Sequence, residues 1–197
     1  MNVFRGVFVS SLLVLATVSF AQPDTGPDGL GLYFDQGAAV VSATMTEETE
    51  SVTAYLILNN PTVEGNLNHW SAGVSAFLGG PGNAQVTGSP VVGQNLASNM
   101  PGSESWTFEV SVGDEPTLPT ENITVLAVIN ILPYVYDVPI HLYVTFGWEF
   151  GGYGTDLGGA DFQPSSGSWD LPVAVINGQA PVAEKSQSWG QVKAIFR

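Results

Sequence analysis

Hydrophobic and polar residues alternate along much of the chain. In the clearest stretch, Trp106, Phe108 and Val110 lie on one face of an extended backbone, and Thr107 and Glu109 lie on the other. No window after the first 21 residues keeps the 3.6-residue period of an amphipathic helix over three turns. The pattern therefore predicts β-strands with Phe108 in the core.

Further strands are predicted wherever the same alternation, or a short apolar run, is bounded by turn residues. They are expected at 30–35, 38–45, 52–58, 70–78, 84–92, 105–112, 123–132, 140–146, 169–176 and 191–196. Two of them, 52–58 and 123–132, are apolar at nearly every position, as strands covered on both faces are. Nine or ten short strands predict one all-β domain, a β-sandwich of jelly-roll, cohesin-like or immunoglobulin-like type.

A small outer-membrane β-barrel would also show alternating strands. Barrel strands alternate apolar residues facing lipid with polar residues facing the lumen. The runs 52–58 and 123–132 would instead place Leu, Ile and Val in the lumen. The soluble sandwich is therefore the favoured alternative.

The N-terminus has the pattern of a secretory signal peptide. Arg5 precedes an apolar run over 7–18, and Ser19 and Ala21 are the small residues expected at a cleavage site before Gln22. The run is shorter than the roughly 20 residues that span a bilayer. We therefore expect a signal peptide over 1–21, a flexible lead-in over 22–29 and a β-sandwich domain over 30–197. No transmembrane helix is expected in the mature chain.

Positive charge is almost absent from the chain. Four Lys and Arg residues stand against 18 Asp and Glu, which gives a net charge of −14, and no Lys or Arg lies between Arg5 and Lys185. Such a surface repels phosphates, so nucleic acid is excluded as a partner, while glycans, extracellular proteins and cations are not. The absence of cysteine excludes disulfides, thiolate metal sites and a cysteine nucleophile.

Catalytic patterns are scarce. His69 and His141 lie on predicted strands without metal-ligand spacing, and no G-x-S-x-G turn presents a serine nucleophile. Glu109 and Glu149 lie beside aromatic residues, and a pair of carboxylates is sufficient for a glycoside hydrolase. An enzyme that acts on glycans is therefore the alternative to a binding module.

The segment 147–162 (GWEFGGYGTDLGGADF) is the best candidate for a site, because long glycine-rich loops are often functional. Trp148 and Tyr153 would form a platform for sugar rings. Glu149, Asp156 and Asp161 would supply oxygen ligands to Ca²⁺, although their spacing is not that of an EF-hand. The competing interpretation is structural: the aromatic residues cover the open end of the sandwich and the glycines form bulges.

The apolar run 52–58, the turn Asn60-Pro61 and the strand expected over 67–78 resemble the opening of cohesin modules and related carbohydrate-binding β-sandwiches of bacterial secreted proteins. The stretch from Gly167 to Arg197 resembles the C-terminus of uncharacterised exported bacterial proteins. The resemblance implies a non-enzymatic module of the periplasm, cell surface or extracellular space, which binds a glycan or a protein or has a structural role.

The signal-peptide prediction is tested by mass spectrometry of the exported protein. We expect an N-terminus at Gln22, since Ser19 and Ala21 are the small residues that a signal peptidase requires before its cleavage site. An exported product that begins at Met1 would contradict the expected cleavage.

Overall fold

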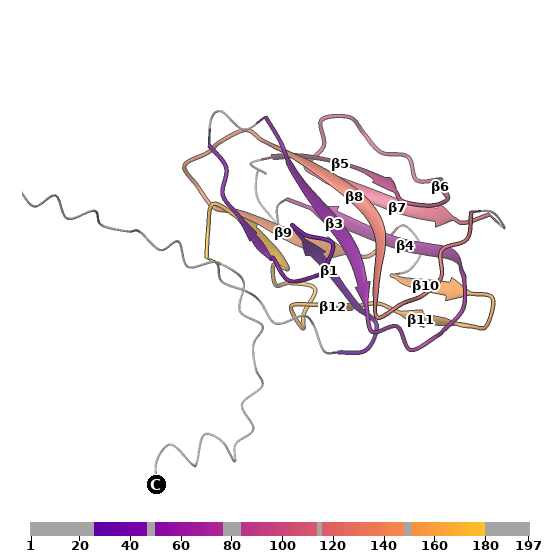
Figure 1. Cartoon of the computed structure of the whole chain (residues 1–197). Coiled ribbons are helices and arrows are strands. Elements are labelled where there is room, and N and C mark those ends of the chain that lie inside the picture. The colour runs from indigo at the N-terminus through magenta and orange to yellow at the C-terminus, as the bar shows by residue number, and fades with distance from the viewer. Residues whose placement is uncertain (1–25, 47–49, 77–83, 114–115, 148–150, 180–197) are drawn as a thin grey trace, which may run out of the picture.

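Two β-sheets make up the part of the chain that the computed structural model describes, residues 26–46, 50–76, 84–113, 116–147 and 151–179. These residues form 13 strands and no helix, which confirms the all-β prediction. Figure 1 shows the strands in two layers, as in a β-sandwich. Nothing among the described residues is a helix long and apolar enough to cross a membrane. The predicted signal peptide and the strand expected over 191–196 lie outside the described residues.

The first sheet has the strand order β12-β1-β3-β8-β5. Its strands are β1 (Gly29–Tyr33), β3 (Val52–Asn59), β5 (Ala84–Pro90), β8 (Ile123–Pro133) and β12 (Gln163–Pro164). The two nearly continuous apolar runs are thus its central strands, β3 and β8, as predicted.

The second sheet is built around β4 (Leu67–Ser75) and has the order β11-β10-β4-β9-β13-β2, with β7 also paired to β4 and β6 paired to β7. Its other strands are β2 (Ser42–Ala43), β6 (Gln94–Asn95), β7 (Ser105–Ser111), β9 (Ile140–Thr145), β10 (Gly152–Thr155), β11 (Gly159–Asp161) and β13 (Ala174–Ile176). Because β7 pairs with β4 over Ser75 to His69, the pairings with β9 and β10 must share the opposite edge of β4.

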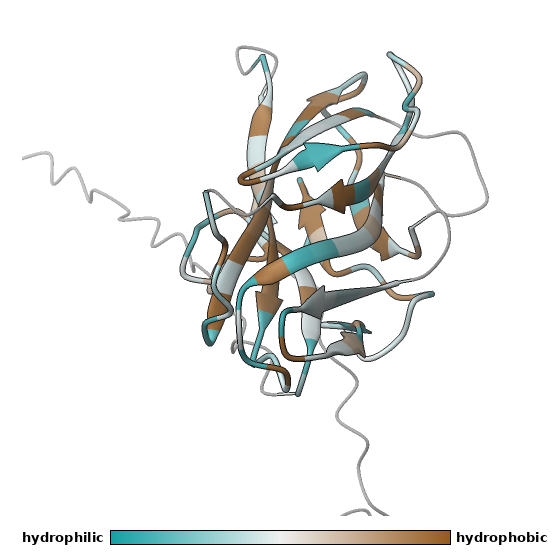
Figure 2. Ribbon diagram, turned by 90° about the vertical axis from the view of Figure 1, so that its right-hand side faces the viewer, coloured by the Kyte–Doolittle hydropathy of each residue, from teal (hydrophilic) through white to brown (hydrophobic). Residues whose placement is uncertain are grey.

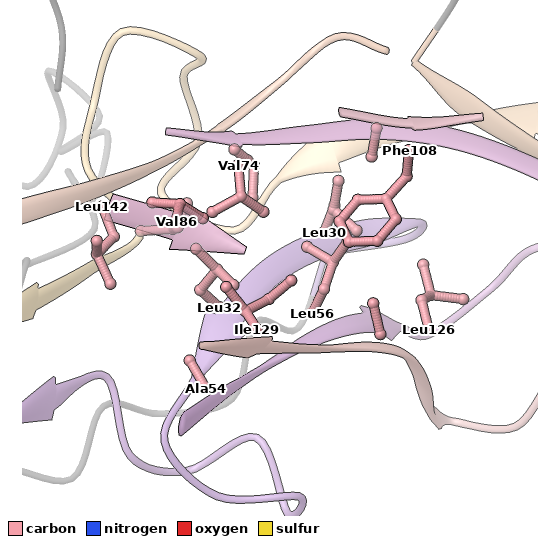
Figure 3. Packing of buried hydrophobic residues seen from close by; sticks show 14 of the residues in the cluster. Leu30, Leu32, Ala54, Leu56, Val74, Val86, Phe108, Leu126, Ile129 and Leu142 are labelled. Carbon is pink, nitrogen blue, oxygen red and sulfur yellow. The ribbon is translucent and has the colours of Figure 1, made fainter. Parts of the chain in front are cut away.

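One hydrophobic cluster joins the two sheets. Figure 3 shows Phe108 of the second sheet among Leu30 and Leu56 of the first. Phe108 is fully buried and its ring lies 5.1 Å from that of Trp70, whereas the neighbouring Thr107 is only half-buried. Figure 2 shows hydrophobic residues lying mainly along the strands. The inward face predicted for 105–112 is therefore correct.

A second, smaller cluster covers part of the other face of the first sheet. It contains Tyr33, Ala38, Val41 and Ile57. The carboxylate of Asp35 closes the loop that contributes to it, because its Oδ1 accepts the amide N–H groups of the residues at 39 and 40, at 3.0 and 2.7 Å. This cluster explains the apolar residues on both faces of β3.

Three sequence-based boundaries need correction. The strand expected over 38–45 is reduced to β2, because the Asp35 loop bends its first residues away from an extended course. The strand expected over 169–176 is reduced to β13, since Ser166 Oγ donates to the carbonyls of Ser168 and Leu171 and holds a turn there. The segment 147–162, expected as a loop, contains the hairpin of β10 and β11.

Truncation of Phe108 tests the assignment of faces on β7. We expect Phe108→Ala to lower the free energy of unfolding by about 3–5 kcal/mol, because it leaves a cavity between the sheets. Thr107→Ala is the matched control, and its cost should stay below about 1 kcal/mol because its backbone bonds to Asn99 are retained. Chemical denaturation measures both, and equal losses would contradict the assignment.

Candidate functional site

The second sheet is interrupted opposite the middle of β4. Thr145, the last residue of β9, pairs with Gly73, and Gly152, the first residue of β10, pairs with Ser71. Both strands are antiparallel to β4, so they run in the same direction along one edge. On β4 a single residue, Ala72, separates these two pairs, whereas in the sequence residues 146–151 connect them. We refer to these six residues as the 146–151 insertion.

The insertion begins against a buried polar pair. Ser71 is fully buried and its hydroxyl donates to Oε1 of Glu109, at 2.6 Å, on the face of the sheet away from the core cluster. A Cβ on Gly147 would lie 1.6 Å from Ser71 Oγ and 2.9 Å from Glu109 Oε1. Only glycine fits this close approach. The absence of a side chain at Gly147 thus allows the backbone at the start of the insertion to approach Ser71 and the Glu109 carboxylate.

An aromatic pair lies at the end of β9. Phe146 is 59% exposed, and its ring lies 4.3 Å from that of Trp169, with 30° between the planes. Trp169 is half-buried and packs against the edge of the core cluster. The pair thus combines a ring fixed by the core with a ring open to solvent. Trp148 and Glu149, predicted as site residues, lie outside the described residues.

Tyr153 does not form a surface for a ligand. It is 2% exposed, and its ring stacks on Phe162 with 5.5 Å between the centroids. Its position on β10 is paired with Trp70 of β4, and both rings belong to the core cluster. The burial of Tyr153 agrees with the structural interpretation of the segment 147–162, in which its aromatic residues cover the core.

The hydroxyl of Tyr153 belongs to a buried polar network. It donates to Oδ1 of Asp28, at 2.5 Å, and accepts the amide N–H of Val63, at 3.2 Å. Thr62 donates its amide N–H and its hydroxyl to the two oxygens of Asp28, each at 2.7 Å. Burial, and then the hydrogen bond to Asp28, raise the pKa of Tyr153. The network fastens the residues before β1 to the β3–β4 loop and to β10.

Asp156 and Asp161, the other predicted calcium ligands, lie at different places on the β10–β11 hairpin. Asp161 pairs with Gly152 at one end of the hairpin, while Asp156 lies in the turn at the other end, where its Oδ1 accepts the amide N–H of Asn66, at 2.9 Å. Three residue pairs separate the ends, which corresponds to roughly 10 Å. Within the described ranges, no three His, Asp or Glu residues gather as a metal site requires.

A polar groove of about 350 Å³ lies between the β3–β4 and β7–β8 loops. It is lined by Pro61, Glu64, Gly65, Asn66, Pro119, Thr120, Glu121 and Asn122. Because no aromatic ring lines it, the groove offers hydrogen-bonding groups but no flat apolar surface.

The two histidines lie on different strands and do not pair with each other: His69 pairs with Gly154 and Ser111, and His141 pairs with Val175. His69 and His141 are both exposed, on β4 and β9, and His69 Nδ1 lies 2.5 Å from Asn68 Oδ1. They are the exposed strand histidines that the sequence predicts.

Sequence reasoning identified Glu109 but missed its environment. Phe146 was expected only as the end of the strand over 140–146 and Trp169 as the start of the strand over 169–176, and the sequence does not indicate that they meet. The one signal that points to the site is the glycine at 147, which the close approach to Ser71 requires.

No family model matches the chain, and comparisons with the curated proteins and with the solved structures find no match. The function must therefore be argued from the site itself.

Tyr153→Phe tests the buried network, because it removes the hydroxyl and keeps the ring. We expect a loss of about 1–3 kcal/mol at neutral pH, since Asp28 and the amide of Val63 each lose a partner. The raised pKa means that the stabilisation by this hydroxyl is fully present below pH about 10 and is lost as the pH rises further.

The wild-type stability should therefore fall more steeply above pH about 10 than that of Tyr153→Phe. Tyr55→Phe, on a half-buried ring of the first sheet, is the control. Denaturation at a series of pH values measures all three proteins. Equal stability of wild type and Tyr153→Phe at neutral pH would show that the Tyr153 hydroxyl contributes nothing to the free energy of unfolding.

Proposed function

We propose that the protein is an exported, non-enzymatic β-sandwich that binds a glycan at the aromatic pair of Phe146 and Trp169. The observation that carries the proposal is the close contact of these two rings, one of them largely exposed, at the end of β9. A sugar ring has an apolar C–H face, which packs on an aromatic ring, and hydroxyl groups, which donate to carboxylates. The pair of Phe146 and Trp169 presents the aromatic surface that such a C–H face requires.

The exposure of Phe146 supports a binding role. Phe146 is 59% exposed and lies against a second ring. Contact of this apolar surface with water is unfavourable, so a ligand that covers the ring gains free energy by removing it from water. Packing against the core cluster holds the ring of Trp169 in place. A preorganised binding surface loses less conformational entropy on binding than free side chains do.

Export and location follow from the signal-peptide pattern, and the resemblance to carbohydrate-binding sandwiches of secreted bacterial proteins agrees with a glycan ligand. We place the protein in the periplasm, at the cell surface or outside the cell. A partner protein at the same surface is the second kind of ligand that the sequence leaves open.

The test is a glycan-binding screen on residues 22–197, followed by titration calorimetry with the best ligand. We expect Phe146→Ala to weaken binding at least tenfold, because it removes the exposed ring without a large change in the core. Trp169→Ala should have a similar effect, with folding checked by circular dichroism because this ring is half-buried.

Leu157→Ala is the matched control, since Leu157 is 74% exposed in the turn of the β10–β11 hairpin. Its affinity should equal that of the wild type. A glycan that binds all four proteins equally would place the site elsewhere, and release of shorter sugars during the assay would favour the glycan-active enzyme.

A further inference from the structure

One edge of β7 faces away from β4. In an antiparallel pair, alternate residues bond to the partner strand. The amide N–H of Val112 donates to the Asn68 carbonyl of β4, at 2.8 Å, so the residues at 110, 108 and 106 also bond to β4. The amide and carbonyl groups of Thr107 and Glu109 therefore point outward. Such an edge is a template on which another strand can pair.

Two asparagine side chains take the place of a further strand along this edge. Asn99 accepts the amide N–H of Thr107 at its Oδ1, at 2.7 Å, and donates from Nδ2 to the carbonyl of the same residue, at 2.8 Å. Asn95 accepts the amide N–H of Glu109 and donates to the Thr107 carbonyl, each at 3.0 Å. The amide of Leu96 donates to the Glu109 carbonyl, at 2.8 Å. All four outward backbone groups of the two residues are thus occupied.

These bonds come from residues 94–99, which we call the edge cover. It begins with β6, which pairs with Ser111 and Val110 of β7 (Figure 1). Its largest apolar side chain, Leu96, is 64% exposed, and none of its six residues belongs to the hydrophobic core cluster or packs against it. Hydrogen bonds rather than apolar burial hold the cover, as in segments that open locally at low cost in free energy.

The edge beneath the cover is complementary to itself. Two copies of β7 can pair antiparallel about a two-fold axis, with Thr107 of one copy opposite Glu109 of the other. Each of these residues would then exchange both backbone hydrogen bonds with its partner. This register places no carboxylate directly opposite another, which would be destabilising. The groups that bond to the cover are therefore the groups that a second copy requires.

We propose that the β7 edge is a pairing surface for a second copy of this chain, and that Asn95 and Asn99 keep it closed in the monomer. Opening of the cover would join the second sheets of two copies into one continuous sheet. The inference does not rest on the proposed function, because neither Phe146 nor Trp169 belongs to β7 or to the cover.

The test compares the mature protein, residues 22–197, with the double variant Asn95→Ala/Asn99→Ala. Sedimentation equilibrium is measured over a range of protein concentrations in about 0.15 M salt, where repulsion between two acidic copies is screened beyond about 8 Å. We expect a monomeric wild type and a variant whose dimer has a Kd at least tenfold lower. The reason is that three of the four outward groups lose their partners.

Hydrogen exchange locates the contact. In dilute solution, the amides of Thr107 and Glu109 should exchange at least tenfold faster in the double variant than in the wild type. Their protection should return at concentrations at which the dimer forms. The amide of Phe108, which faces β4, is the internal control and should be protected throughout.

Two further variants serve as controls. Asn130→Ala removes an exposed asparagine of β8, whose Oδ1 accepts the Thr53 hydroxyl at 3.3 Å, and should stay monomeric. Asn99→Asp is used if circular dichroism shows that the double variant does not fold. Its carboxylate still accepts the Thr107 amide but cannot donate to the carbonyl, so the Kd should fall at least threefold.

Three outcomes would overturn the inference. A variant that stays monomeric while Thr107 and Glu109 exchange rapidly would show that the open edge does not pair with itself. Unchanged protection of both amides in a folded variant would show that the asparagines do not close the edge. Association without renewed protection of these amides would place the contact elsewhere.

Discussion

Three partly buried carboxylates, Asp28, Asp35 and Glu109, accept hydrogen bonds from uncharged donors in a chain that has no Lys or Arg from position 6 to 184. Asp28 binds the hydroxyls of Thr62 and Tyr153, Asp35 binds two backbone amides, and Glu109 binds a serine hydroxyl. Each bond joins segments or closes a loop. The positions of the loops around both sheets therefore depend on short, directional hydrogen bonds, where other proteins use ion pairs.

This constraint has a direct effect at β4. Its pairing with β7 sets Ser71 opposite Glu109, so the hydroxyl lies next to the carboxylate across the ladder. On its other edge β4 pairs with both β9 and β10, and the backbone at Gly147 approaches Ser71 and Glu109 closely. The position of this polar pair thus results from a register that the core imposes, since Trp70 and Phe108 bury the inner face of the same two strands.

Alternation along the sequence was sufficient to predict the long strands and their inner faces. Phe108 is buried as expected, and β3 and β8 are central because both of their faces carry apolar residues. The short strands were missed, because β10 and β11 consist largely of glycine and small residues whose pairing leaves no hydropathy pattern. Contacts between distant segments were equally invisible: nothing in the sequence links Trp169 to Phe146, or Asp28 to Tyr153.

The interruption between β9 and β10 also has a consequence for how the chain can change. Thr145 and Gly152 pair with residues two positions apart on β4, so the side-chain alternation of the sheet continues across the gap whatever lies between them. The number of residues in that gap is therefore not coupled to the register of the strands on either side. Evolution or engineering can therefore exchange the residues that follow Gly147 for a segment of different length while the strands on either side keep their register.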